Sequence, residues 1–475
     1  MKSIIWFRND LRLDDNPSLR EACKNSSELH AIFLYSYDQL EKHNEANVKI
    51  DFLIKSIQSL NASLQKLNIP LTIINSEGFE QDPDIILNLA KERNVEKVFI
   101  NKQFGNDEQN RDKRARELLN AANIKTEFFN DQIVYEAGSI RTGQDNPYSV
   151  FTPFKRKWVE SFDMEFLDID YHYAPQKNSD LKSNLDSFDF KHEIKHKVDM
   201  SLWPAGEEHA LNRLVDFLKN RAVNYSKDRN DPIKDGTSRM SPYLALGVIS
   251  SKRCILEGLK LNNFEFNSGN SGITKWIDEI VWREFYRNIM FSFPKVGRNQ
   301  PFQDFSKSIQ WRFEEAELHA WKTGMTGFPI IDAAMRQLLH EGWMHNRLRM
   351  VVAMFFTKNM LHDWRLGEKF FMENLIDGDF PSNNGGWQWS SSTGTDAAPY
   401  FRIFNPITQS QNFDPTGEFI KKFIPELNDV PVKNIHQPTE GLFSSYDYPK
   451  PILDLKDSRQ RAISAFKEAR DSGTI

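Results

Sequence analysis

The sequence is poor in cysteine: Cys23 and Cys254 are the only two in 475 residues. So few cysteines exclude a disulfide-rich secreted domain and nearly exclude a metal centre built from thiolates. The composition fits a reducing compartment, so we expect a cytoplasmic protein, and no residue pattern predicts a bound metal.

Long apolar runs are also missing, and no stretch is long enough to cross a membrane. The apolar start of the chain is similar to the core of a signal peptide but is cut off by Arg8, Asn9 and Asp10. The net charge is −5, so the chain lacks the strongly basic character of many nucleic-acid-binding domains. We expect no membrane contact, and any binding of DNA has to depend on a local basic face.

The first 130 residues lack a Gly-rich dinucleotide fingerprint, but short apolar runs alternate there with helical patterns. Asn16-Pro17 is a helix start, and apolar residues keep helical spacing between residues 50 and 67. The runs that we predict as strands are residues 3–7, 29–35, 71–74, 97–100 and 125–129. This alternation predicts a Rossmann-like α/β domain with a parallel sheet over residues 1–130.

The periodicity fades between Asp131 and Pro204, and residues 176–201 are polar and irregular. We interpret residues 131–205 as a connector, because such a long irregular stretch is unusual inside one compact domain. From residue 206 onward, apolar and aromatic residues recur at three- and four-residue spacing. This pattern predicts a larger, all-α domain over residues 206–475.

The most unusual stretch is residues 377–389, which begins Asp-Gly-Asp and ends Gly-Gly-Trp-Gln-Trp. Gly is unfavourable inside a helix, and Asp and Asn prefer local hydrogen bonds. The stretch therefore predicts a tight polar loop that opens into tryptophans, either as a binding site or as an exposed turn before core aromatics.

With residues 390–402, this stretch resembles the flavin-binding core of the photolyase/cryptochrome family, and the resemblance covers essentially the whole chain. It is closest to the bacterial class I photolyases that act on cyclobutane pyrimidine dimers. The resemblance implies a DNA-repair lyase with FAD as cofactor, which uses blue light to split the dimer by electron transfer. It also implies that the dimer is turned out of the duplex and that the protein is a monomer.

Residues 236–242 carry hydroxyl side chains at a helix start, where they suit either an anion or a simple cap. The resemblance implies that this block binds the flavin diphosphate and that Asn383 faces the flavin nitrogen that gains a proton on reduction. It also implies that Arg349 pairs with a nearby carboxylate. The implied flavin-binding residues are Tyr225, Thr237, Ser238, Arg239, Met240, Ser241, Trp276, Arg349, Asp377, Gly378, Asp379 and Asn383.

Glu279 and Trp282 are three residues apart and share one face of a predicted helix. Taken alone, Glu279 is equally well an ion-paired carboxylate, with Arg283 one turn further on. The resemblance implies that Glu279 is protonated and hydrogen-bonds the dimer radical anion, which burial in an apolar pocket would favour by raising its pKa. The implied lesion pocket consists of Glu279, Trp282, Asn346, Met350 and Trp389.

Two other activities of the same family remain as alternatives. In the branch that repairs (6-4) photoproducts, histidines stand where this sequence has Asn346 and Met350, and Met cannot transfer protons as His does. Cryptochrome-like blue-light receptors resemble this site too, but plant members carry Asp and animal members Cys in place of Asn383. The sequence also has no long tail after Ile452. These residues favour the cyclobutane substrate.

Three further sets follow from the resemblance. Taken one at a time, the tryptophans of these sets are more often core residues, and the arginines are more often solvated surface residues. The implied electron-transfer chain is Trp311, Trp364 and Trp387, and the implied DNA-binding residues are Arg229, Glu279, Trp282, Arg283, Tyr286, Asn346, Arg347 and Arg402. The implied antenna site for a folate, 5,10-methenyltetrahydrofolate, consists of His43, Asp107, Glu108 and Arg298. Asp107 and Arg298 replace the family's usual Asn and Lys, which changes charge and shape.

Overall fold

The computed structural model describes residues 1–169, 171–177, 181–190, 195–439 and 447–472. The chain forms two compact units. The first consists of Met1–Lys195, Trp203–Val223 and Ser238–Pro294, and the second of His196–Leu202, Asn224–Thr237 and Lys295–Ile475. The limits of these two units differ from the domain limits at residues 130 and 206 that the sequence indicates. Those domain limits stay a prediction.

The first unit contains a five-stranded parallel sheet with the strand order β3-β2-β1-β4-β5, as the sequence predicts. Its strands are β1 (Lys2–Phe7), β2 (Glu28–Tyr35), β3 (Leu71–Asn75), β4 (Lys97–Asn101) and β5 (Lys125–Phe129). In the central strand, Ile5 pairs with Ala31 on one side and with Phe99 on the other. The connecting helices are α1 (Pro17–Asn25), α2 (Tyr37–Lys42), α3 (Asn47–Gln65), α4 (Asp82–Glu92) and α5 (Asn106–Ala121).

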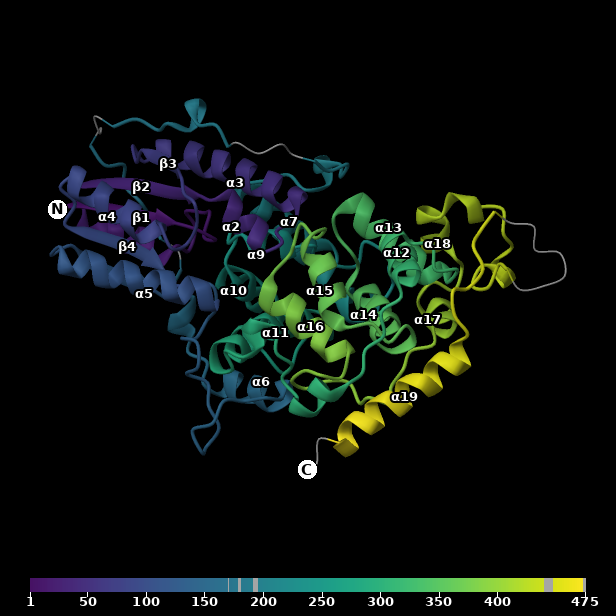
Figure 1. Cartoon of the computed structure of the whole chain (residues 1–475). Helices are drawn as coiled ribbons and strands as arrows, with labels where there is room; N and C mark the ends of the chain where they lie inside the picture. Colours follow the sequence, from purple (N-terminus) through teal and green to yellow (C-terminus); the bar gives the residue numbers. More distant parts are fainter. Residues whose placement is uncertain (170, 178–180, 191–194, 440–446, 473–475) are drawn as a thin grey trace. The chain divides into compact units, whose positions relative to one another are not determined.

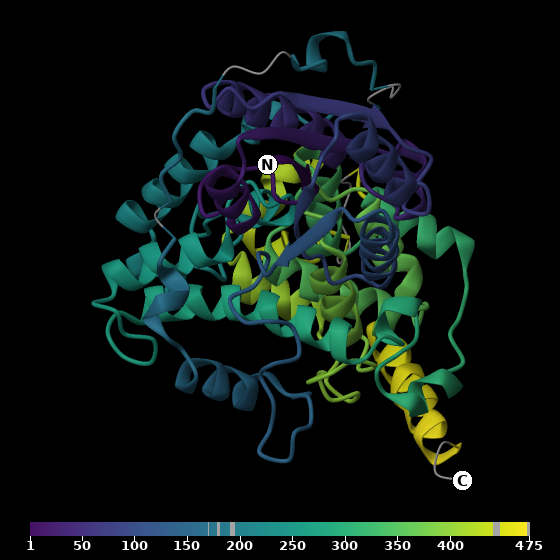
Figure 2. The ribbon, with the colours of Figure 1, turned by 90° about the vertical axis from the view of Figure 1, so that its left-hand side faces the viewer.

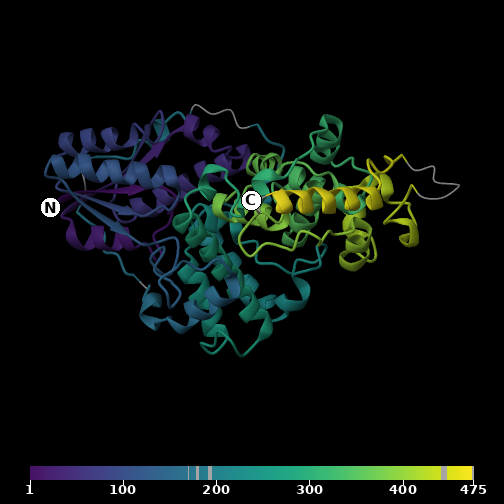
Figure 3. The same cartoon turned by 60° about the horizontal axis from the view of Figure 1, so that its bottom comes forward.

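The sheet lies between two helical layers (Figure 3). Ile4 and Trp6 of β1 pack with α4 and α5, in a cluster that includes Ile86 and Leu119. Because successive side chains of a strand point to opposite faces, Ile5 and Phe7 face the other layer, where α1 packs. Buried apolar residues on both faces explain why the strands are continuous apolar runs. Helix α1 begins as predicted, with the Asn16 side chain accepting a hydrogen bond from the Leu19 amide at 3.1 Å.

Helix α6 (Phe151–Glu160) lies within the stretch that the sequence analysis interprets as an irregular connector. Phe151, Phe154 and Trp158 form its buried face. The helix is short and its polar face is highly charged, so its periodicity is weak in a long window. The remaining helices of the first unit are α7 (Glu207–Asn220), α9 (Ser241–Ala245), α10 (Ser251–Leu261) and α11 (Ser271–Ser292).

The second unit is helical, as predicted for the C-terminal part of the chain (Figure 1). Its helices are α8 (Tyr225–Asp228), α12 (Glu315–Thr323), α13 (Pro329–Glu341), α14 (Asn346–Met354), α15 (Trp364–Met372), α16 (Phe380–Ser390), α17 (Pro406–Phe413), α18 (Glu418–Phe423) and α19 (Leu455–Ser472). Helix α19 is the long yellow helix in Figures 2 and 3. Trp321, Phe356, Phe371 and Trp387 are central to the core of this unit.

The chain also contains a π-helix and several short 3-10 helices. A π-helix, η7 (Phe355–Asn359), follows α14 directly. The short 3-10 helices are η1 (Met164–Leu167), η2 (Leu185–Ser187), η3 (Met200–Leu202), η4 (Ala222–Asn224), η5 (Val296–Arg298), η6 (Asp304–Ser308), η8 (Pro425–Leu427) and η9 (Val432–Asn434). Within the described part of the chain, we find no helix with the length and apolar character that a membrane span needs.

Candidate functional site

Helix α11 of the first unit carries several of the predicted site residues. Asn270 caps it by accepting hydrogen bonds from the Gly272 and Ile273 amides at 2.8 and 3.1 Å. Trp276 is buried on this helix, and its indole N–H donates to the hydroxyl of Ser238 at 3.2 Å. The structure thus joins two residues that the sequence analysis assigns to one flavin site.

The loop before α9 has an unusual backbone. Arg239 has a φ of 49°, a conformation that L-residues other than Asn and Asp rarely adopt. Such strain is concentrated at functional sites, where the surrounding structure holds it. Met240 is buried, and Ser241 begins the short helix α9. Thr237 directly precedes this loop, although it is counted with the second unit.

Glu279 forms an ion pair with a lysine of its own helix. Its carboxylate lies 3.7 Å from the ammonium of Lys275, one turn earlier on α11. Arg283, the partner considered from the sequence, donates to the carbonyl oxygens of Gln132 and Leu244 at 2.6 and 3.0 Å. Its pairing with Glu279 stays a prediction. These bonds give Arg283 a structural task, and its expected contact with DNA stays a prediction.

Trp282 is held by an aromatic partner that sequence analysis missed. Its ring stacks on Phe151 of α6, with centroids 3.7 Å apart and planes at 10°. Tyr286, one turn further along α11, lies 5.6 Å from the Trp282 ring. An ion pair between Lys155 and Asp278 at 2.6 Å also joins α6 to α11. Helix α6 therefore fixes the face of α11 that carries Trp282.

In the second unit, α14 carries Asn346 and Met350 one turn apart, as predicted, with Asn346 exposed and Met350 partly buried. Arg347 donates to the side-chain oxygen of Asn230 at 2.8 Å, and its guanidinium lies over the Phe413 ring. Burial lowers the pKa of Arg347, and the positive charge of Arg229 lowers it further. Two arginines whose charges repel make a site that attracts an anion, as expected for a phosphate contact.

Arg349 binds the carboxylate of Asp377 through one nitrogen at 2.8 and 3.0 Å, as expected from the sequence. The Asp377 side chain is 3% exposed. Two residues further on, Asp379 caps α16 by accepting hydrogen bonds from the Ser382 amide and hydroxyl. Gly378 connects the two carboxylates and is buried.

The prediction of a polar loop over residues 377–389 is wrong, because most of this stretch is helix α16. The Asp379 cap and Pro381 in the first turn favour a helix start at this point. Side-chain hydrogen bonds then offset the low helix propensity of Gly385 and Gly386: the Asn384 amide binds Glu368, and the Gln388 amide binds Asn384. Tertiary contacts therefore override the local preference.

Asn383 is oriented by a backbone group of α15. Its side-chain N–H donates to the carbonyl oxygen of Glu368 at 2.9 Å, which leaves its own oxygen as an acceptor. The next residue, Asn384, donates to the Glu368 carboxyl at 3.1 Å. Burial raises the pKa of Glu368 to about 7. Sequence analysis missed Glu368, because a single Glu in an amphipathic helix gives no sign of its burial.

The three tryptophans of the predicted electron-transfer chain occupy adjoining segments of the second unit. Trp364 begins α15, and the Trp387 ring packs against Gly367 of the same helix. Trp311 precedes Arg312, whose amide donates to the Leu361 carbonyl at 2.8 Å, beside the segment that leads into Trp364. Trp364 and Trp387 are buried, whereas Trp311 is partly exposed. This order suits a path from the surface to the interior.

The remaining predicted residues of the second unit are placed as follows. Tyr225 is buried beneath the guanidinium of Arg229, 5.2 Å from its ring centre. Trp389 is partly buried near the end of α16, and its carbonyl accepts a hydrogen bond from the Ala398 amide at 3.2 Å. Arg402 is exposed next to Phe401, which is 60% exposed. Arg298 ends the short helix η5.

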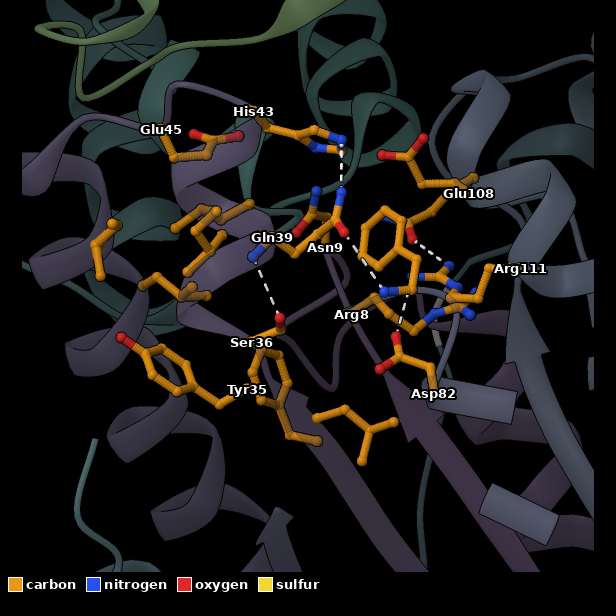
Figure 4. A pocket seen from close by; sticks show the side chains of 18 of the residues that line it. Arg8, Asn9, Tyr35, Ser36, Gln39, His43, Glu45, Asp82, Glu108 and Arg111 are labelled. Carbon is orange, nitrogen blue, oxygen red and sulfur yellow. Dashed lines mark hydrogen bonds and ion pairs between the residues drawn. The ribbon is translucent and has the colours of Figure 1, made fainter. Parts of the chain in front are cut away.

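A cavity of the first unit contains two of the predicted antenna residues, His43 and Glu108 (Figure 4). His43 ends α2, lies edge-on to the Phe79 ring and is 3.3 Å from the Asp107 carboxylate. Figure 4 shows His43 and Glu108 on one side of the cavity and Tyr35 on the other. The structure thus brings His43, Asp107 and Glu108 together, and it describes Arg298 with the other unit.

Charged and aromatic groups lie close together in the same cavity. The guanidinium groups of Arg8 and Arg111 are 4.8 and 5.1 Å from the centre of the Trp6 ring. Both arginines also pair with Asp112, at 3.1 and 2.8 Å. Planar cations above an indole, beside polar groups, form a lining that suits an aromatic, polar ligand.

Comparison with known proteins gives one consistent result. The family model "DNA photolyase" matches residues 3–176, and the model "FAD binding domain of DNA photolyase" matches residues 276–468. The deoxyribodipyrimidine photo-lyase of Buchnera aphidicola is 39% identical over 99% of this chain and 97% of its own length. The enzyme of the same name from Escherichia coli is 38% identical over 98% of each chain.

The chain belongs to the DNA photolyase family. A crystal structure of a class III photolyase from Agrobacterium tumefaciens superimposes with a TM-score of 0.88, at 32% identity, over 99% of this chain and 98% of that one. Family membership establishes the α/β plus helical fold expected from the sequence, and FAD as the cofactor.

The residues present fit a flavin of the photolyase family. The loop at Arg239 has a strained backbone and carries the hydroxyl residues Thr237, Ser238 and Ser241 next to the start of α9, a composition that suits a diphosphate. The Asn383 amide offers its oxygen, which suits an N–H of the ring. Among the residues that the structure describes, we find no group of three or more His, Cys, Asp or Glu side chains placed to hold a metal ion.

Proposed function

We propose that this photolyase family member is a deoxyribodipyrimidine photo-lyase, which repairs cyclobutane pyrimidine dimers in DNA with light. The single observation that carries the proposal is the full-length similarity to enzymes of that name, at 37–39% identity. Met350, one turn after Asn346 on α14, supports a substrate that needs no proton transfer from His.

Each part of the proposed site has a task. Reduced FAD, when bound, supplies the light-excited electron that opens the cyclobutane ring. Glu279 donates a hydrogen bond to the dimer, and Trp282, Trp389, Asn346 and Met350 are its other proposed contacts. Stabilising charge where it develops is usually the largest contribution of such a site. Trp387, Trp364 and Trp311 return the cofactor to its reduced form under light.

Because the whole chain is acidic, binding of damaged DNA has to depend on a local group of positively charged side chains. Arg229, Arg347 and Arg402 would contact phosphates, and affinity would then fall as salt rises. The cavity around His43 and Glu108 would hold an antenna chromophore, for which a folate is our proposal. The two cysteines are free, which supports a reducing cytoplasm, and we propose a monomer.

The decisive experiment is illumination of the flavin-loaded, chemically reduced protein with DNA that contains cyclobutane dimers. We expect dimers to disappear in the light and to persist in the dark. The same assay with (6-4) lesions should show no loss. A reduced, flavin-loaded sample that leaves the cyclobutane dimers intact would refute the proposal, and repair of the (6-4) lesion would change the assigned substrate.

Replacing Glu279 tests its proposed role. We expect E279A to repair dimers about tenfold more slowly with unchanged flavin content, because the loss of one hydrogen bond to the dimer costs about 1.4 kcal/mol. E257A is the matched control: Glu257 is also 29% exposed and ion-paired to a lysine of its own helix, Lys260. If E279A instead loses flavin, Glu279 belongs to cofactor binding.

The Phe151 stack gives a further prediction. F151A removes the ring that holds Trp282, and we expect the affinity for dimer-containing DNA to fall about two- to tenfold, the range for an aromatic pair. F162A is the control, since Phe162 packs against Trp158 and Phe266 of the same unit. Equal binding by F151A and the unaltered protein, in a filter or polarisation assay, would show that α6 does not position Trp282.

A further inference from the structure

Glu368 is a buried acidic side chain that the proposed repair cycle does not use. It is 5% exposed on α15, four residues after Trp364 and next to Gly367, against which the Trp387 ring packs. It is therefore on the same helix as one member of the proposed electron-transfer chain and adjoins the glycine that contacts another. Buried carboxyl groups are rare unless they have a partner or a task.

Its contacts connect it to the amide that would face the flavin. Its backbone carbonyl accepts from Asn383 at 2.9 Å, and its carboxyl accepts from Asn384 at 3.1 Å. Asn384 in turn accepts from Gln388 at 2.9 Å, and Gln388 accepts from the Phe302 amide at 2.9 Å. Asn384 and Gln388 are almost completely buried, so their hydrogen bonds lie in a region of low dielectric constant and are stronger than in water.

Few charges oppose or balance the carboxyl. Arg365, on the same helix, acts on it, but the Arg365 guanidinium also pairs with Asp363 at 2.9 Å. The groups that face it from α16 are the neutral amides of Asn383 and Asn384, and Lys369 of α15 lies 3.7 Å from Glu373. Burial raises the pKa of Glu368 to about 7, whereas the Asn384 hydrogen bond and Arg365 lower it.

We infer that Glu368 is a positioning residue that orients the flavin-facing amide of Asn383 and exchanges a proton with water when the flavin gains an electron. The inference rests on the proposed function. The step is balanced: an electrode or chemical reductant supplies one electron to the flavin, one O–H bond of a water molecule breaks as its proton forms an O–H bond on the carboxylate, and the buffer neutralises the hydroxide that remains. The carboxyl is thus neutral when the site carries the added negative charge.

The sign of the effect follows from charge. Below about pH 7 the carboxyl is neutral, and above it the carboxylate makes addition of an electron less favourable. The flavin potential should therefore fall with rising pH more steeply in the unaltered protein than in E368Q. Gln keeps the hydrogen-bond acceptor for Asn384 but cannot ionise.

Spectroelectrochemical titration of the flavin-loaded protein between pH 6 and pH 9 tests the inference. We expect E368Q to match the unaltered protein at pH 6. At pH 9 the flavin potential of E368Q should be about 59 mV higher than that of the unaltered protein. This difference corresponds to a change of about tenfold in the one-electron equilibrium constant. E373Q is the control, because Glu373 is exposed on the same helix, and it should follow the unaltered protein throughout.

A second readout uses infrared difference spectra of the photoreduced minus the oxidised protein at pH 8. We expect a carbonyl band of a newly protonated carboxyl group, which is absent in E368Q. Parallel potentials at every pH, or a band that persists in E368Q, would overturn the inference while leaving the repair proposal intact. A protein that binds no flavin would instead refute the proposed function.

Discussion

W387F should lose almost all light-driven reduction of its oxidised flavin, while chemically reduced W387F still repairs dimers. Trp387 is one of the two buried members of the proposed chain, and its ring packs between Gly367, Phe371 and Phe356. Phenylalanine keeps most of the packing but is far harder to oxidise than an indole. The expected measurement is the rate at which the oxidised flavin band disappears under blue light with an external reductant.

W321F is the matched control for this experiment. Trp321 is buried in the same cluster, 6.1 Å from the Trp387 ring, but it is not a member of the proposed chain. Both substitutions remove the same atoms from one core, so their stabilities should be similar. Normal photoreduction by W387F would contradict the proposed chain. Equal loss in W321F would move the first donor to Trp321.

The sequence predicts the sheet well because its signals are local. The apolar runs of β1 and β4 are buried on both faces, so they stand out as continuous runs with helices between them. The cap at Asn16 is equally local, since it depends on one side chain and the amide three residues later. Such features need no knowledge of distant contacts.

Residues 377–389 show where local reasoning fails. Three glycines and four Asx residues argue against a helix, but α16 forms because Glu368 and Asp379 hold its polar side chains. Arg283 gives the same lesson. Its guanidinium donates to the carbonyl oxygens of Gln132 and Leu244, which are far from it in sequence. Only the tertiary structure can supply such partners.

The resemblance supplied most of the candidate site, and the geometry adds residues that the resemblance did not name. Phe151 could have been found from its spacing with Phe154 and Trp158, which marks the buried face of a helix. Glu368 could not, because its importance depends on burial and on two amides of another helix. Phe151 contacts Trp282 and Glu368 contacts Asn383, so each of these two residues positions a residue of the proposed site.

G367A should destabilise the protein and slow photoreduction. A methyl group at Gly367 would lie within 2.7 Å of three ring carbons of Trp387. That ring is enclosed by Phe371, Phe356 and Trp321, so it cannot move without disturbing the core. Overpacking costs about 1–3 kcal/mol, of which the better helix propensity of Ala offsets about 1 kcal/mol.

The measurement for G367A is thermal unfolding together with the photoreduction rate, and G143A is the control. Gly143 has no heavy atom within 4 Å of an added Cβ, so G143A should unfold at the temperature of the unaltered protein. A G367A protein that is equally stable and equally photoreducible would show that the Trp387 ring has free space. Electron transfer through Trp387 would then not depend on the close packing of its ring against α15.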